Sequence, residues 1–414
     1  MFISQQRERV SALVREYPRA FWTLTAVTFI DHVGGAVLFP FFALYITHRF
    51  SVGMTEVGIL FAFFSISGFV GSMLGGALTD RLGRKGMIIF GLLATSLSTL
   101  IMGFVDSLEA FYVLALVAGV FTDIGGPAQQ AMVADLLPER QRAQGFGILR
   151  VALNVSVSVG PAIGGFLAAR SYLLIFIADA VASLITAALV LWKLLETRPE
   201  SSSEGQPESV RTTFRGYFTV LRDGPFLSFL GANLLLGLVY MNLNTTLGVY
   251  LRDEHGVPTS GYGMLISINA IMVVAMQFWI TRRVSKFPPM LMMAMGSVLY
   301  AVGFGMYGVV GVFAFFVVAM AVLTLGEMVV APVSQALVAE LSPEDMRGRY
   351  MAVFGISWMV PFAAGPYLAG LILDGSRPAN LWLVAGLIGF AAGVWFLRLH
   401  SGRTAKRQDE KTLV

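Results

Sequence analysis

Long apolar stretches without a single charged side chain recur along this chain. Six of them are residues 57–79, 86–105, 226–251, 256–281, 351–373 and 378–397. A helix needs about 20 apolar residues to cross a hydrocarbon core of roughly 30 Å, so each stretch predicts one transmembrane helix. The charge-free run 287–326 is long enough for two such helices joined near its central glycines. With the apolar stretches that a single acid interrupts, the pattern predicts an all-α membrane protein of twelve transmembrane helices in two six-helix halves.

Composition supports this interpretation of the pattern. The 414 residues are 56% hydrophobic and 13% charged, whereas soluble domains carry about 25% charged residues. The absence of cysteine excludes disulfides, thiolate metal sites and cysteine nucleophiles. Residues 1–19 are charged rather than apolar, which is not the pattern of a cleavable signal peptide.

Positive charge is distributed unequally between the two sides of the predicted bundle. With a cytoplasmic N-terminus, all but four of the 29 Lys and Arg residues fall on the cytoplasmic side; the four are Arg49, Arg170, Arg252 and Arg377. The positive-inside rule therefore predicts a multi-pass protein of the inner (plasma) membrane with both termini in the cytoplasm. Topology and lipid contact explain the basic C-terminal tail, so we expect no nucleic-acid partner.

The two halves of the chain are related by an internal repeat. Residues 127–165 align with residues 332–370 without a gap, and the matches include proline, glutamine, glutamate and arginine. Six helices per repeat give both halves the same orientation in the membrane. Parallel halves of this kind are typical of secondary transporters, whose substrate site lies near the membrane midplane between the halves.

The repeat predicts a division of the chain into four parts. These are a six-helix half over 1–195, a linker over 196–224, a second six-helix half over 225–400 and a basic tail over 401–414. Pro, Ser and Gly in the linker predict a flexible connection. Its later part, residues 210–222, mixes aromatic and basic side chains at helical spacing and predicts a short interfacial helix.

The loop after the second predicted helix carries a dense pattern of glycines and charges. Residues 75–85 are Gly-Gly-Ala-Leu-Thr-Asp-Arg-Leu-Gly-Arg-Lys. The signature between helices two and three of the major facilitator superfamily is matched, position by position, by Gly76, Leu78, Asp80, Arg81, Gly83, Arg84 and Lys85. With the half-chain repeat, essentially the whole chain resembles this superfamily, and within it the twelve-span drug:H+ antiporters.

The resemblance implies a latch on the cytoplasmic side. Asp80 and Arg84 would join Asp135, at the end of helix four, and hold that side shut in the outward-facing state. A charge-assisted network that exists in one conformation biases the equilibrium between two. The other signature residues of this latch are Gly76, Arg81 and Gly83. The second half has Thr-Arg-Arg-Val-Ser-Lys in the same place, so we expect an asymmetric latch.

A proline flanked by glycines lies in the middle of the fifth predicted helix. Pro161 removes a backbone hydrogen bond and bends the helix, and Gly160, Gly164 and Gly165 let a neighbouring helix approach closely. The run resembles the antiporter signature of the same family, which favours export over import. Ser156 departs from that signature, which has glycine at this position.

Four carboxylates interrupt the predicted membrane helices: Asp31, Asp123, Asp179 and Glu327. A charge near the bilayer centre costs roughly 2.5–3.5 kcal/mol on insertion scales, so each is a candidate functional residue. Asp31 lies midway along helix one, which lines the central cavity in the family that the chain resembles, and is the first candidate for a proton site. For its neighbour His32 two roles are open: a packed imidazole with satisfied hydrogen bonds, or a proton relay.

The repeat relates two of the acids. It places Thr122 over Glu327, so Asp123 and Glu327 occupy adjoining positions in the equivalent helices four and ten. We expect both near the midplane, where each can bind protons or a cationic substrate. Arg150 is the nearest candidate cation, and a pair with Asp123 would be structural. For Asp179 we expect a hydrogen bond to a nearby helix dipole or loop.

Together these features predict a proton-coupled exporter of amphipathic, often cationic compounds that works by alternating access. The alternatives are a carrier of one metabolite or lipid, such as a sugar, a lysolipid or a siderophore, and, remotely, an intramembrane enzyme. No zinc ligand cluster, catalytic dyad or nucleotide-binding loop is evident in the sequence. We therefore expect no enzymatic activity, no metal and no cofactor, with the proton gradient as the energy source. We expect a monomer that carries a small molecule.

Overall fold

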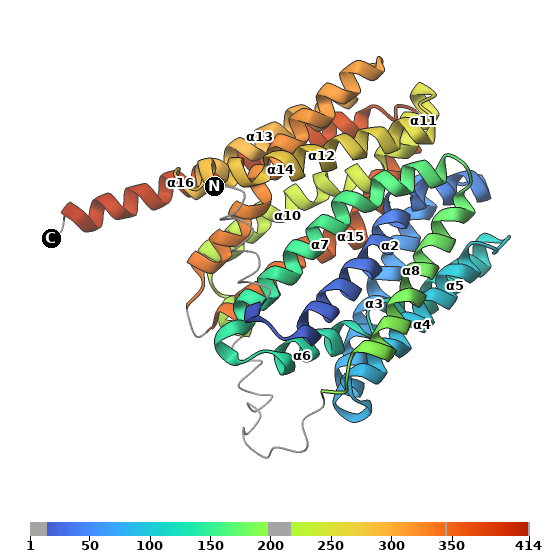
Figure 1. The fold of residues 1–414 in the computed structure, drawn as a ribbon. Coiled ribbons are helices and arrows are strands. Elements are labelled where there is room, and N and C mark those ends of the chain that lie inside the picture. Colours follow the sequence, from blue (N-terminus) through green and yellow to red (C-terminus); the bar gives the residue numbers. More distant parts are fainter. Residues whose placement is uncertain (1–14, 198–216, 344–345, 413–414) are drawn as a thin grey trace, which may run out of the picture. The chain divides into compact units, whose positions relative to one another are not determined.

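The computed structural model describes residues 15–197, 217–343 and 346–412, and no strand occurs in these ranges (Figure 1). The helices are α2 (Arg19–Phe50), α3 (Met54–Leu82), α4 (Arg84–Met102), α5 (Leu108–Thr122), α6 (Gly126–Leu136), α7 (Glu139–Ala168), α8 (Tyr172–Lys193), α10 (Gly224–Thr245), α11 (Leu247–His255), α12 (Thr259–Val284), α13 (Pro289–Tyr307), α14 (Phe313–Leu341), α15 (Arg347–Leu373) and α16 (Asn380–Thr412).

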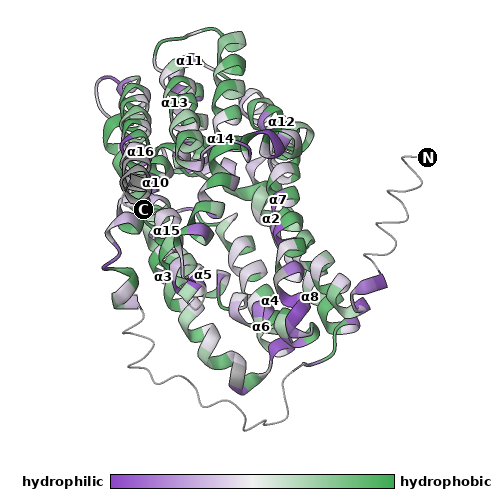
Figure 2. Cartoon of the chain, turned by 90° about the vertical axis from the view of Figure 1, so that its left-hand side faces the viewer, coloured by the Kyte–Doolittle hydropathy of each residue, from purple (hydrophilic) through white to green (hydrophobic). Residues whose placement is uncertain are grey.

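Twelve segments are long and apolar enough to cross a membrane, with α5 and α6 together forming one of them. This confirms the predicted all-α fold with twelve membrane helices. Hydrophobic residues cover most of each helix, and hydrophilic residues gather near α4, α6 and α8 (Figure 2). The last helix continues through the basic tail as far as Thr412.

The chain packs as two units. Unit 1 comprises Met1–Phe41 and Phe63–Ser203, and unit 2 comprises Phe42–Ala62 and Glu204–Val414. The boundaries after Phe41 and Ala62 fall inside α2 and α3, so the adjoining ends of these two helices belong to unit 2. Most of the predicted interfacial helix lies outside the described residues, and residues 217–220 are helical.

Glycines bring α7 and α2 of unit 1 into close contact. A Cβ at Gly160 would lie 2.4 Å from a methyl carbon of α2, and one at Gly164 would lie 2.3 Å from a carbonyl oxygen of α2. Gly165 is buried as well, and Pro161 lies inside an unbroken α7. The glycines of this helix therefore serve close helix packing, as their spacing predicts.

Aromatic rings fill one part of the core of unit 2. Trp382 of α16 is fully buried and stacks on Phe304 of α13, with 6.3 Å between the ring centroids. Tyr307 of α13 stacks in turn on Phe316 of α14, with 5.7 Å between the centroids. Stacked aromatic pairs contribute beyond their buried area, so these rings fasten α13, α14 and α16 to one another.

The equivalent spans four and ten differ in continuity. Span four consists of α5, which ends at Thr122, and α6, which begins at Gly126, whereas span ten is the single helix α14. Pro127 lies in the first turn of α6, where its missing N–H removes no helical hydrogen bond. Pro332, its counterpart, lies inside α14. Two glycines precede Pro127, whereas Val and Ala precede Pro332, and glycine favours a helix break.

Candidate functional site

A buried hydroxyl group holds Asp31 in unit 1. Ser183 Oγ of α8 donates a hydrogen bond to Asp31 Oδ1 of α2 over 2.8 Å. Ser183 is 1% exposed, and Thr186, about one turn further on, donates to the carbonyl oxygen of Val27 over 3.3 Å. Since residues one turn apart share a helix face, α8 presents two hydroxyl groups to α2 and fixes the position of the carboxylate.

Asp179 lies next to Asp31. A Cβ at Gly34, one turn after Asp31, would lie 2.9 Å from Asp179 Oδ1, so the Asp179 carboxylate packs directly against α2. The carboxylate accepts a hydrogen bond from Thr99 of α4 and interacts electrostatically with Asp31. The partner is thus a side chain of a neighbouring helix, whereas a helix dipole or a loop was expected for Asp179. Its proximity to Asp31 has no signal in the sequence, because nothing there relates α2 to α8.

His32 and Asp123 belong to the same electrostatic group. His32 Nδ1 lies 3.0 Å from the carbonyl oxygen of Thr28, and the imidazole is exposed rather than packed. It interacts electrostatically with both Asp31 and Asp123. A Cβ at Gly68 of α3 would lie 2.9 Å from Asp123 Oδ2. Unit 1 thus gathers titratable groups from α2, α8 and the break in span four.

Asp123 occupies the break itself. It is the C-cap residue of α5, with φ −106° and ψ 0°, and its own carbonyl oxygen accepts a hydrogen bond from Gly126 N over 3.2 Å. Within the described ranges no ion pair joins Asp123 to Arg150, whose side chain is exposed on α7. The structural pair expected for these two residues is therefore not formed in this structure.

Two polar side chains hold both oxygens of Glu327 in unit 2. The Tyr240 hydroxyl of α10 donates to Oε1 over 2.8 Å, and Asn269 Nδ2 of α12 donates to Oε2 over 2.8 Å. Asn269 Nδ2 also lies 2.9 Å from Thr324 Oγ1, one turn before Glu327 on α14. Hydrogen bonds to a carboxylate are stronger than those between neutral groups, so three helices together fix this acid.

Aromatic rings surround the Tyr240 side of this carboxylate. The Tyr240 ring meets the Trp358 ring edge to face, with 5.8 Å between the centroids, and lies 6.0 Å from the Tyr300 ring. Trp358 is 37% exposed, so a ligand can reach it. A carboxylate in an aromatic cluster with one accessible ring suits an organic cation, which is attracted to both. Tyr240 and Asn269 were not identified from the sequence as partners of Glu327. The signal that could have pointed to them is their polarity within apolar membrane helices.

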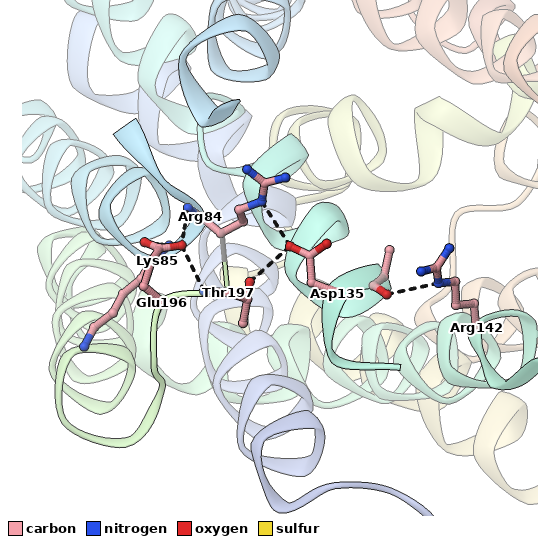
Figure 3. A network of polar contacts seen from close by, with 7 residues as sticks. Arg84, Lys85, Asp135, Arg142, Glu196 and Thr197 are labelled. Atoms are coloured by element: carbon pink, nitrogen blue, oxygen red, sulfur yellow. Dashed lines mark hydrogen bonds and ion pairs between the residues drawn. The ribbon is translucent and has the colours of Figure 1, made fainter. Parts of the chain in front are cut away.

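A second polar network surrounds the loop between α3 and α4 in unit 1 (Figure 3). Arg84 Nε lies 3.0 Å from Asp135 Oδ2, which also accepts a hydrogen bond from Thr197 Oγ1 over 3.2 Å. Glu196 accepts from the backbone N–H groups of Arg84 and Lys85 over 2.8 and 3.1 Å. The structure therefore brings together Arg84 and Asp135, as the family resemblance implies. The side chain of the third expected partner, Asp80, lies outside the described residues.

Glu196 and Thr197 are members of this network that sequence reasoning missed. They follow α8 and lie at the start of the predicted linker. Gly83 has φ +92°, and a Cβ there would lie 2.5 Å from Glu196 Oε2, so glycine is needed for both conformation and space. Glu196 supplies the N-terminal cap of α4 that Gly83 lacks. Of the other signature residues, Gly76 borders open space and Arg81 is exposed.

No three His, Cys, Asp or Glu side chains come together as a metal-binding group in the part of the chain that the structure describes. The candidate chemistry therefore lies in the carboxylates around Asp31 and Glu327, which can exchange protons or bind cations.

Comparisons with known proteins agree with this geometry. The family model of the Major Facilitator Superfamily matches residues 24–241 and 229–413. A Na(+), Li(+), K(+)/H(+) antiporter from Planococcus maritimus is 25% identical, over 94% of this chain and 99% of its own. Multidrug resistance protein 2 from Bacillus subtilis is 27% identical, over 64% of this chain and 66% of its own. A crystal structure of a POT family transporter shares the fold, with a TM-score of 0.76 at 14% identity over 93% of this chain and 96% of its own.

Proposed function

Because the chain belongs to the major facilitator superfamily, and is therefore a secondary transporter rather than an enzyme, we propose that it exports amphipathic organic cations in exchange for protons. The observation that carries this proposal is the environment of Glu327. Its two oxygens are held by neutral donors, Tyr240 and Asn269, and the accessible Trp358 ring lies against Tyr240. A neutral shell leaves the negative charge of the carboxylate available to a cation, and the rings supply apolar contact.

Asp31 is the proton site in this proposal. Ser183 donates a hydrogen bond to its carboxylate, and a second carboxylate, Asp179, lies close by. Like charges at short range repel, so a proton held by this pair relieves the repulsion, and its release on the other side of the membrane can be coupled to the export of a cation. The proton gradient supplies the energy, and no cofactor takes part.

The names of the relatives support exchange of a cation for a proton. One is an antiporter of alkali cations and protons, and another is a multidrug resistance protein. The first of these, aligned over nearly the whole chain, favours a second candidate, exchange of Na+, Li+ or K+ for protons. The oxygens of Asp31, Asp179, Ser183 and Thr99 are ligands that such hard cations accept. We further propose a monomer in the plasma membrane with both termini in the cytoplasm.

Transport in proteoliposomes with an imposed pH gradient tests the proposal. We expect the parent protein to accumulate tetraphenylphosphonium against its gradient, and Asp31→Asn to abolish the accumulation because the carboxylate that exchanges the proton is gone. Glu109→Gln, in the first turn of α5, makes the same change of charge outside the site and should transport normally. Undiminished pH-driven accumulation by Asp31→Asn would sink the role of Asp31. Collapse of the pH gradient by NaCl or LiCl, without any response to organic cations, would select the second candidate.

A further inference from the structure

A side chain from α15 caps the first turn of α3. Asp374, the C-cap residue of α15, accepts hydrogen bonds from Met54 N through Oδ1 and from Thr55 N through Oδ2, each over 2.8 Å. The Thr55 hydroxyl donates a third hydrogen bond to Oδ2 over 2.6 Å. All of these residues belong to unit 2.

This cap replaces one that α3 cannot make for itself. The residue before Met54 is Gly53, which has no side chain to accept from the free N–H groups of the first turn. A Cβ at Gly53 would lie 2.5–2.8 Å from the Asp374 carboxylate, so the missing side chain is also what makes room for the acid. A negative charge at a helix N-terminus is further stabilised by the helix dipole.

Close backbone packing accompanies the cap. A Cβ at Gly58 of α3 would lie 2.4 Å from Tyr367 N, and one at Gly370 of α15 would lie 2.5 Å from the carbonyl carbon of Met54. One turn deeper, the rings of Phe61 and Phe362 meet edge to face with 5.6 Å between their centroids. The first turns of α3 therefore lie directly on the end of α15, and the Asp374 carboxylate is the polar contact at the tip of this packing.

The cap lies at one end of a helix that is divided between the two units, so it can affect transport. α3 has 29 residues and is roughly 43 Å long, and its residues beyond Ala62 belong to unit 1. The helix thus belongs to one unit at its capped end and to the other along the rest of its length. Asp374 is itself exposed, so water can replace the three donors when the contact opens. A contact of this kind can be released in a cycle, unlike one buried in a core.

We propose that Asp374 is a clasp. Its carboxylate holds the first turn of α3 against the end of α15 in this structure, and it releases that turn when the carrier opens on that side. The inference rests on transport by alternating access, as proposed above, and concerns which residue holds the closed state. By the predicted topology, this end of α3 faces outward. Asp374 is a positioning residue, because it acts through the first turn of α3 and contacts no substrate.

The absence of cysteine makes the test direct. Val57 of α3 is fully buried, so Val57→Cys is a single reporter that a membrane-impermeant maleimide reaches when the clasp opens. Replacing a capping side chain by alanine changes an equilibrium by about fivefold, so Asp374→Ala should raise the labelling rate about fivefold in purified protein. Thr55→Val removes one of the three hydrogen bonds and should raise it less. Glu254→Ala removes a carboxylate from the pocket that Asp374 also lines, and should leave the rate unchanged.

A double variant separates a clasp from a simple helix cap. Gly53→Ser gives α3 a cap of its own, and the space that the carboxylate leaves in Asp374→Ala accommodates the new side chain. The double variant should therefore regain the helix end without regaining its tie to α15. If Asp374 is a clasp, labelling in the double variant stays high, and Asp374→Glu, which keeps the charge, labels more slowly than Asp374→Ala. A return to the parent rate in the double variant, or no rise in Asp374→Ala, would overturn the proposal. Labelling needs no substrate, so a failure to transport organic cations would leave this test intact.

Discussion

Spans four and ten are equivalent in the repeat but differ in how each accommodates its acid. In span four the chain breaks, and Asp123 caps the end of α5 in a turn. In span ten the helix is continuous, and Glu327 receives hydrogen bonds from α10 and α12. Among the described residues, none donates a hydrogen bond to the Asp123 carboxylate. The repeat therefore relates positions in the chain, whereas the neighbouring side chains decide what each acid can do.

The difference arises from a few residues. Span four has Gly125 and Gly126 before its proline, and span ten has Val330 and Ala331 there. Glycine is about 1 kcal/mol less favourable than alanine inside a helix, so two of them before a proline end the helix. Discontinuous helices near substrate sites are common in transporters, where they leave the backbone free to adjust. We infer that span ten provides a fixed binding group and span four a place that can move.

The largest effect is expected from removing the charge of Glu327. Loss of one partner of a buried, hydrogen-bonded charge pair costs about 2–5 kcal/mol, so Glu327→Gln should raise the KM for tetraphenylphosphonium at least about thirtyfold. Asp123→Asn, the matched change in span four, should raise KM by less than about threefold on the same scale. Initial rates in proteoliposomes measure both. If Asp123→Asn proves as severe as Glu327→Gln, the contrast between the two spans has no functional meaning.

A smaller effect is expected from the shell of Glu327. Tyr240→Phe keeps the aromatic ring but removes a hydrogen bond to a charged group, worth about 1.5–3 kcal/mol, because the carboxylate then loses one of its two fixed positions. We expect KM for the cation to rise about tenfold with little change in maximal rate. Tyr300→Phe is the control, since Tyr300 packs on Tyr240, whereas the donors to Glu327 are Tyr240 and Asn269. Equal effects of the two substitutions would show that ring packing, not the hydrogen bond, matters.

The helices of this protein were predictable because each needs a long apolar run, which is a property of one contiguous segment. The contact between Arg84 and Asp135 was predictable from the family resemblance, since the signature loop occupies a known place in that fold. The partners of the buried acids were not. Asp179 beside Asp31 and Asn269 beside Glu327 depend on which faces of separate helices meet, and twelve apolar helices offer many such pairings with similar hydrophobic energy.

The break in span four was only partly predictable from the sequence. Gly-Gly-Pro at residues 125–127 is a local signal for a helix break, but the apolar pattern runs through it and predicts one span. A membrane tolerates such a break where other helices satisfy the free backbone groups. Here the carbonyl oxygen of Phe121 accepts from the N–H of Ile124, and Thr95 Oγ1 of α4 donates a further hydrogen bond to it over 3.4 Å. Local sequence thus indicates the break, and a tertiary contact stabilises it.

The smallest effect is expected from closing the break itself. Gly125 has a right-handed helical backbone, and a Cβ there would lie 3.7 Å from its nearest neighbour, while one at Gly126 would meet nothing within 4 Å. Alanine therefore fits at both positions, and the double variant should gain up to about 1 kcal/mol per substitution in helix stability. Its melting temperature should rise slightly.

If the break moves during transport, the maximal rate of the double variant falls about two- to threefold while its KM is unchanged, because a stiffer helix opposes the motion and leaves Glu327 untouched. An unchanged maximal rate together with the higher melting temperature would mean that the break is a passive feature of packing, and the mobile role inferred for span four would have to be abandoned.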